Sequence, residues 1–170
     1  MNKNTSNIED IKISGKYTIT HMNSNREVLG VMEVDNIIVN SGLTYILQLV
    51  AKQPSLSLYI GLFSGNYTPV AGDTAATFPA AATEFTGYSE TTRVLYNPAV
   101  PSTPALSNSA SKAEFNITAA GTIYGAFIST ASAKSDTTGT LYSAKKSASP
   151  RTVAIGDILV VQYDNTIASA

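Results

Sequence analysis

Strict alternation of apolar and polar residues recurs along this chain, and it constrains the fold more than any other feature. Segment 56–62 (LSLYIGL) places Leu or Ile at every second position, and segment 11–20 (IKISGKYTIT) alternates in a similar way. A period of two places successive side chains on opposite faces, so each segment predicts a strand with one buried face. Segment 158–163 (ILVVQY) is almost continuously apolar, as is typical of a central strand.

One segment has the period of a helix. Residues 41–51 begin with Ser41, and serine is a residue type that commonly caps the first turn of a helix. Pro54 follows and is expected to end the helix. The apolar residues that recur at the spacing of one helix face are Leu43, Ile46, Leu47 and Val50.

Short strands dominate the pattern, and strand and helix do not alternate along the chain. We therefore expect a mainly β protein, an antiparallel β-sandwich or jelly-roll-like barrel with the helix of residues 41–51 closing one end. Further strands are expected at 27–34, 92–96, 113–118, 122–129 and 140–144. The residues expected in the core are Ile60, Leu62, Phe115, Phe127, Ile158, Val160 and Leu47.

The length of 170 residues suits a single domain. We assign residues 11–170 to that domain and residues 1–10 (MNKNTSNIED) to a flexible N-terminal arm. Ile8 is the one apolar residue of this arm after the initiator methionine, which is too little apolar surface for independent folding. We expect the arm to become ordered on a neighbouring subunit, with Ile8 as its anchor.

Composition excludes several classes of function. The 11 basic and 12 acidic residues give a net charge of −1, which does not supply the basic face that nucleic-acid binding requires. The chain has no cysteine, so disulfides, thiol catalysis and thiolate metal sites are excluded. No apolar run reaches the length of a membrane span, and the N-terminus lacks the pattern of a signal peptide. We expect neither nucleic acid nor membrane among its partners.

The sequence contains no recognisable catalytic set. His21 is the one histidine and lies beside a predicted turn, where we interpret it as a surface or strand-end residue. Glu84, Glu90 and Arg93 flank an aromatic turn and form either a small polar site or an ion pair that holds the loop, and we favour the ion pair. Residues 156–157 (GD) suggest a calcium corner, yet a turn before a strand needs no ion. We expect no catalytic residue, cofactor or metal, and hence no enzyme.

Two long segments without periodicity interrupt the strands. Segment 66–83 (NYTPVAGDTAATFPAAAT) and segment 97–109 (NPAVPSTPALSNS) are rich in Pro and small residues. Loops of this length are uncommon in a compact domain unless they are functional. Both segments are therefore candidate contact loops.

Several short blocks follow one another in a characteristic order that covers most of the chain beyond residues 1–10. The blocks are 15–20 (GKYTIT), 36–43 (NIIVNSGL), 62–69 (LFSGNYTP), 84–93 (EFTGYSETTR), 113–118 (AEFNIT), 125–127 (GAF), 150–153 (PRTV) and 156–157 (GD). Each block alone is unspecific, whereas their order resembles a group of small virion proteins of tailed bacteriophages. Such proteins are similar to head decoration (cement) proteins.

The resemblance implies a non-enzymatic virion structural protein, made in the host bacterial cytoplasm, that binds and stabilises the head shell. Its implied partners are the major capsid protein and copies of itself in a homo-oligomer. The alternative is a tail- or fibre-associated module that binds the host surface through loops 66–83 and 97–109. A third hypothesis, a carbohydrate-active β domain, lacks a convergent pair of acids. The residues expected to contact a partner are Ile8, Tyr67, Phe78, Tyr88 and Arg93.

Overall fold

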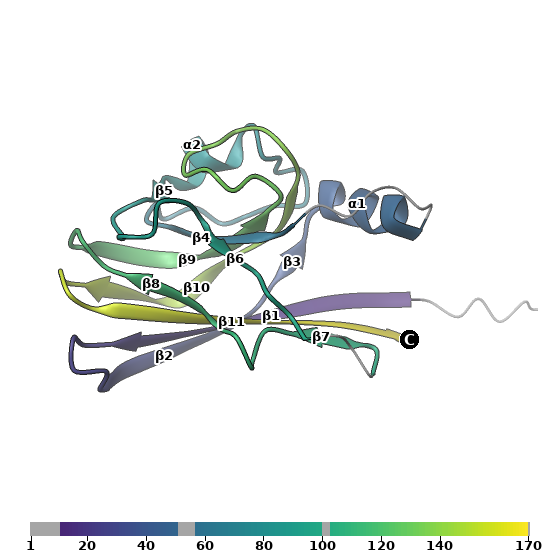
Figure 1. Cartoon of the computed structure of the whole chain (residues 1–170). Helices are drawn as coiled ribbons and strands as arrows, with labels where there is room; N and C mark the ends of the chain where they lie inside the picture. The colour runs from purple at the N-terminus through teal and green to yellow at the C-terminus, as the bar shows by residue number, and fades with distance from the viewer. Residues whose placement is uncertain (1–10, 51–56, 100–102, 170) are drawn as a thin grey trace, which may run out of the picture.

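The computed structural model describes residues 11–50, 57–99 and 103–169. Two antiparallel β-sheets pack against each other, and two helices, α1 (Asn40–Val50) and α2 (Phe78–Ala82), lie outside them (Figure 1). The prediction of a mainly β sandwich is confirmed. The strands in chain order are β1 (Ile11–Met22), β2 (Val28–Asp35), β3 (Ile37–Ile38), β4 (Tyr59–Phe63), β5 (Glu84–Phe85), β6 (Val94–Leu95), β7 (Ala105–Ser107), β8 (Ala113–Asn116), β9 (Gly121–Ser129), β10 (Leu141–Val153) and β11 (Ile158–Ser169).

The two sheets share the chain in an interleaved order. The first sheet has the order β2-β1-β11-β7, and β8 also pairs with β11. The second sheet has the order β3-β10-β9-β4-β5, and β6 also pairs with β4. The short turn at 119–121 therefore connects strands of different sheets, because β8 pairs with β11 while β9 pairs with β10 and β4. Segment 97–109, predicted as a loop, contains the short strand β7.

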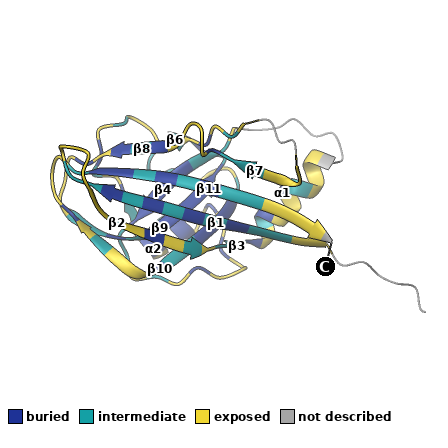
Figure 2. Cartoon of the chain, turned by 90° about the horizontal axis from the view of Figure 1, so that it is seen from below, coloured by how far each residue is buried: buried dark blue, intermediate teal, exposed yellow. Residues whose placement is uncertain are grey.

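The main core lies between the sheets, and β1 shows how the sequence builds it. From Gly15 to Met22 the residues of β1 alternate between buried and partly buried, as the bands along β1 in Figure 2 show. Tyr17 and Ile19 are fully buried, and Tyr17 lies opposite Tyr163 of β11. The predictions of buried side chains at Ile60, Leu62, Phe115, Phe127 and Ile158 are confirmed, whereas Val160 is only partly buried.

A second core lies on the outer face of the second sheet. Phe63 of β4 and Phe127 of β9 point to this face, away from the first sheet. Phe78 of α2 is fully buried against both, with ring centroids 5.6 Å from Phe63 and 5.2 Å from Phe127. Segment 66–83 thus covers the sheet and completes the fold, because β4 and β9 are apolar on both faces.

Helix α1 approaches β10 through its first turn. Ser41 lies inside the helix, so the prediction that it caps the helix is wrong; its hydroxyl donates a hydrogen bond to the main-chain oxygen of Leu141, 2.6 Å away. Gly42 is buried next to it, and a Cβ at this position would collide with the main-chain oxygen of Tyr142. The close approach is possible because glycine has no side chain.

This contact determines which face of α1 is buried. Tyr45 is 5% exposed and belongs to the core between the sheets, and Ile46 is partly buried against it. Leu47 is 69% exposed, so the prediction that it lies in the core is wrong, and Leu43 on the same helix face is 40% exposed. Apolar residues occupy more than one face of α1, and the Gly42 contact selects the face that carries Tyr45.

Candidate functional site

Glu84 and Arg93 form a buried ion pair, which agrees with the structural alternative considered from the sequence. The Arg93 guanidinium donates to Glu84 through Nε (2.9 Å) and Nη2 (2.7 Å), and Nη1 donates to the main-chain oxygen of Ala131 (3.0 Å). Glu84 Oε2 also accepts a hydrogen bond from the Ser135 N–H. Both charged side chains are enclosed, and they join β5, the segment before β6 and the loop that follows β9.

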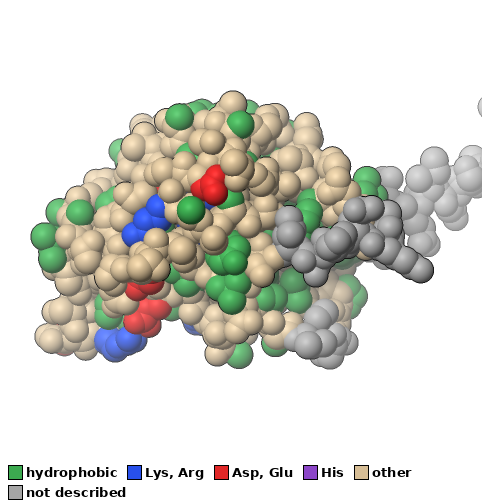
Figure 3. All heavy atoms as spheres, turned by 45° about the horizontal axis from the view of Figure 1, so that its top comes forward, with side chains coloured by type: hydrophobic (Ala, Val, Ile, Leu, Met, Phe, Trp, Pro, Cys, Tyr) green, Lys and Arg blue, Asp and Glu red, His purple; other side chains and the backbone are tan. Residues whose placement is uncertain are grey.

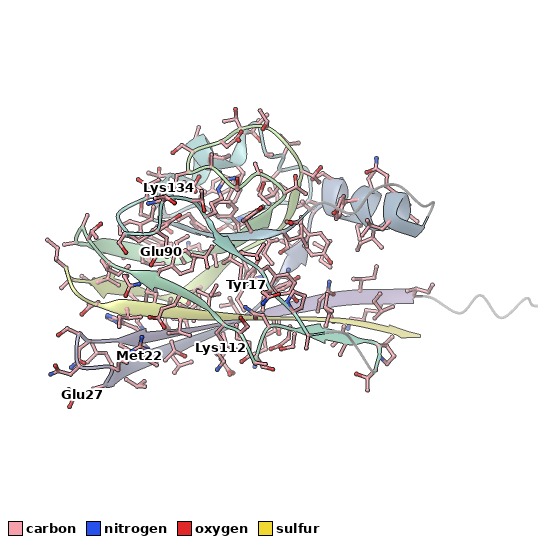
Figure 4. All side chains as sticks on the ribbon, viewed as in Figure 1. Tyr17, Met22, Glu27, Glu90, Lys112 and Lys134 are labelled. Atoms are coloured by element: carbon pink, nitrogen blue, oxygen red, sulfur yellow. The ribbon has the colours of Figure 1, made fainter. Side chains whose placement is uncertain are left out.

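Glu90 does not join this pair. Its carboxylate accepts hydrogen bonds from the main-chain N–H and the side-chain amide of Asn116. Lys134, which the sequence analysis did not single out, lies 3.8 Å from the centroid of the Tyr88 ring and donates to the main-chain oxygens of Thr86 and Tyr88. Burial lowers the pKa of Lys134. Glu90 and Lys134 lie at the end of the molecule opposite α1 (Figure 4) and hold loops in place.

His21 and Asp157 form a second enclosed pair. His21 Nε2 lies 2.7 Å from Asp157 Oδ2, and this carboxylate oxygen also accepts a hydrogen bond from the Ala154 N–H. His21 is 5% exposed and is the next-to-last residue of β1, so of the two predicted alternatives it is a strand-end residue and not a surface residue. The pair joins β1 to the turn between β10 and β11. The aspartate of the suggested calcium corner is thus engaged by protein groups.

Two kinds of site are not found within the described ranges. Among residues 11–50, 57–99 and 103–169, no three His, Asp or Glu side chains gather closely enough to hold a metal ion. In the same part of the chain, neither helix has the length and apolar character needed to cross a membrane.

The predicted contact residues do not form a common surface. Phe78, Tyr88 and Arg93 are at most 3% exposed, so these side chains present almost no surface of their own to a partner. They are buried because Phe78 and Arg93 pack on Phe127 and Tyr88 packs edge-on against a core phenylalanine. Tyr67 is partly buried, and its hydroxyl donates to Asp73. Ile8 lies outside the described residues.

Among the described residues, exposed large apolar side chains occur at several places on the surface. Val28, Leu29 and Val31 lie in β2, and a larger group lies at the end of the molecule that carries α1. We call this surface the apolar end. In both Figure 1 and Figure 2, α1 projects at the same end as the start of β1 and the last residues of β11. The members of the apolar end are Ile11 (74% exposed), Leu43, Leu47, Leu49 and Ile167 (46% exposed).

The first and last strands of the chain form the lower part of the apolar end. They pair continuously from Ile11 opposite Ser169 to Met22 opposite Ile158. Ile11 and Tyr17 are an even number of residues apart, so their side chains lie on the same face of the sheet. Figure 1 shows α1 on this side of β1 and β11. The exposed isoleucines therefore lie on the face of the first sheet that is turned toward the side of α1.

The apolar end rests on a buried network of tyrosine, asparagine and serine. Tyr17 and Tyr163 lie with ring centroids 4.6 Å apart, and Tyr17 Oη is 2.6 Å from Ser143 Oγ of the second sheet. Asn36 donates from Nδ2 to the Tyr163 hydroxyl, 2.8 Å away. Burial raises the pKa of Tyr17 well above its ordinary value, so the phenol stays neutral. Figure 4 shows Tyr17 between the sheets.

An open strand edge adjoins the apolar end. Strand β2 pairs with β1 only from Lys16 to Met22. Beyond that point Asn36 N–H donates to the oxygen of Gly15 (2.7 Å), and the chain then crosses to the second sheet as β3. Residues 11–14 of β1 therefore have a strand partner on one side only among the described residues. A groove of about 580 Å³ lies against residues 12–16 of β1; it reaches Asp35 and Asn36 on the side of the open edge and Asp164 and Thr166 of β11 on the other side.

Sequence reasoning missed this surface because it assigned Leu47 to the core. One signal was present: α1 carries Leu43, Tyr45, Ile46, Leu47 and Leu49, more apolar residues than one face of a short helix needs.

The comparisons with known proteins add nothing to this description. No protein-family model, no curated protein and no solved structure matches the chain.

Proposed function

We propose that this chain is a non-enzymatic structural protein of a bacteriophage virion, a head decoration protein that binds the shell through the apolar end. The observation that carries the proposal is the exposure of Leu43 and Leu47 on a helix that is anchored to β10. Exposed apolar residues that gather on one region of a folded surface mark sites of protein–protein interaction. The order of sequence blocks described above indicates the class of assembly.

The apolar end has the energetic capacity for this role. Burying one leucine side chain stabilises a contact by about 1.5–3 kcal/mol. Leu43 and Leu47 lie one helical turn apart on the same face, so a partner covers both with one groove. Together they change a binding constant by about two to four powers of ten. Each copy then binds with a modest affinity. Because the contact is repeated over the whole shell, the layer of copies together stabilises the shell strongly.

The distribution of charge supports an apolar mode of docking. Figure 3 shows few charged side chains on the face it presents, and those that are visible lie away from the end that carries α1. The most enclosed charged groups, Arg93 with Glu84 and His21 with Asp157, are engaged with each other. Binding at the apolar end is therefore expected to depend weakly on salt, because it involves few ion pairs.

The alternative of a tail- or fibre-associated module has less support. It assigns host binding to loops 66–83 and 97–109. Phe78 is buried in the first loop and β7 pairs with β11 in the second, so both segments take part in the fold. Host binding by these loops would require a group of exposed aromatic side chains. The described residues of the two loops contain no such group.

Copy number tests the proposal against this alternative. Quantitative mass spectrometry of purified virions measures the ratio of this chain to the major capsid protein. A decoration protein should be present in hundreds of copies, in fixed proportion to the capsid subunits. A dozen copies or fewer would contradict shell decoration and favour the tail. Absence from the particle would contradict both.

A further inference from the structure

The free edge of β1 is a strand-binding site that the described part of the chain leaves unfilled. Main-chain groups in a strand point alternately to its two edges. Gly15 accepts a hydrogen bond from Asn36 at the open edge, so the N–H and C=O groups of Ile13 and Ile11 point to that edge as well. An edge with unpaired main-chain groups and a groove beside it favours pairing with an extended segment.

We propose that this edge binds residues 1–10 of a second copy of the chain as an added antiparallel strand. These residues precede β1 directly in the sequence and contain no proline and no glycine. Ten extended residues span about 33 Å, whereas residues 11–14 of the acceptor edge span about 13 Å. The segment is thus long enough to fill the edge and to reach it from a neighbouring molecule.

Charge favours the antiparallel direction. Asp35 and Asp164 line the groove at the end where β2 stops and outnumber the one cation there, Lys16, whereas Lys12 lines the groove nearer its outer end. An antiparallel segment places Lys3 toward this acidic end and leaves Glu9 and Asp10 toward the outer end. A parallel segment would instead place Glu9 and Asp10 against the two aspartates, and like charges repel each other.

A second copy is a better donor than the same chain. To occupy its own groove, the segment before Ile11 would have to reverse direction within Ile8, Glu9 and Asp10. Two-residue hairpin turns of type I′ need a positive φ at both central residues, which Gly, Asn and Asp accept most readily. Of the three residues next to Ile11 only Asp10 is of this kind, and none is glycine, so exchange between two molecules is favoured. The inference concerns copies of this chain alone and holds whether or not they bind a head shell.

Sedimentation velocity of four forms tests the exchange. The full chain should self-associate, and a chain lacking residues 1–10 should be monomeric. Ile13→Pro should also be monomeric, because proline removes an N–H from the open edge while the ladder to β11 uses the alternate residues. Ile13→Ala keeps that N–H and should still associate. A mixture of the truncated chain and Ile13→Pro should form a one-to-one complex, since one has the edge and the other has the segment.

A disulfide test remains decisive if Ile13→Pro fails to fold. The chain has no cysteine, so a Lys3→Cys/Asp35→Cys variant carries only the designed pair. On oxidation it should form covalent dimers. An internal disulfide within a monomer would show that the segment binds its own chain and would overturn the proposal. A full chain that sediments as a monomer, or a truncated chain that associates as the full chain does, would overturn it as well.

Discussion

The two helices lie against the same sheet, yet they leave opposite kinds of surface. Helix α2 inserts Phe78 between Phe63 and Phe127, and this side chain is fully buried. Helix α1 touches β10 through Gly42 and leaves Leu47 69% exposed. Helix α2 therefore completes the core of the single chain, whereas α1 carries apolar side chains that remain exposed in the single chain. Substitutions in the two helices should separate stability from binding.

The largest effect is expected at Phe78. Phe78→Ala removes a ring enclosed by two other phenylalanines and leaves a cavity above the second sheet. The free energy of unfolding should fall by about 3–5 kcal/mol. Urea denaturation followed by circular dichroism measures this loss. Leu47→Ala is the matched control on α1, and it should change stability by less than about 0.5 kcal/mol. Equal losses in both variants would remove the contrast between the helices.

A smaller effect is expected where α1 meets β10. Gly42→Ala introduces a methyl group against the main-chain oxygen of Tyr142, which cannot move without disturbing β10. The collision should destabilise the protein by about 1–3 kcal/mol, although alanine is the better helix former. Thermal unfolding measures the change, with the exposed Gln48→Ala as control. A stabilised Gly42→Ala would show that the helix does not pack through this turn.

The helices show why the sequence predicts where helices and strands lie better than it predicts which of their faces are buried. The alternation in β1 and β4 depends on local period alone, and it predicted the strands and most of the core. The direction in which α1 faces depends on the contact between Gly42 and β10, whose residues are far apart in the sequence. Hydrophobic periodicity contains no information on such a contact, so Leu47 was assigned to the core.

Segment 66–83 shows the same limit of sequence reasoning for a loop. Its composition is typical of a loop, and a contact role followed from its length. The reason for its burial lies in β4 and β9, where Phe63 and Phe127 point away from the first sheet and need a cover. The ion pair of Glu84 and Arg93 was accessible to sequence reasoning, because the two residues are close along the chain and oppositely charged.

A weaker, pH-dependent effect is expected at the far end of β1. Burial alone raises the pKa of Asp157, but the hydrogen bonds from Ala154 and His21 and the charge of His21 outweigh it and lower the pKa below its ordinary value. A depressed carboxylate pKa adds stability above the pKa of the unfolded chain, and this stability is lost as the pH falls through the folded value. Asp157→Asn should therefore lose less stability than the wild type between pH 7 and pH 3.

Urea denaturation at both pH values measures this difference. Asp136→Asn is a useful comparison, because hydrogen bonds from Thr138 lower the pKa of that partly buried aspartate without a histidine partner. An identical acid sensitivity of wild type and Asp157→Asn would show that the pair with His21 does not stabilise the fold.

The account rests on the claim that the α1 leucines serve binding and not folding, and shell occupancy of a Leu43→Ser/Leu47→Ser variant tests it most directly. Particles lacking the wild-type protein are incubated with the folded variant, separated by sedimentation, and the bound copies are counted against wild type. The account predicts a melting temperature within a few degrees of wild type, since both side chains are exposed, and a loss of binding of about a hundredfold or more. A variant that keeps its melting temperature and decorates shells as fully as wild type would contradict the claim.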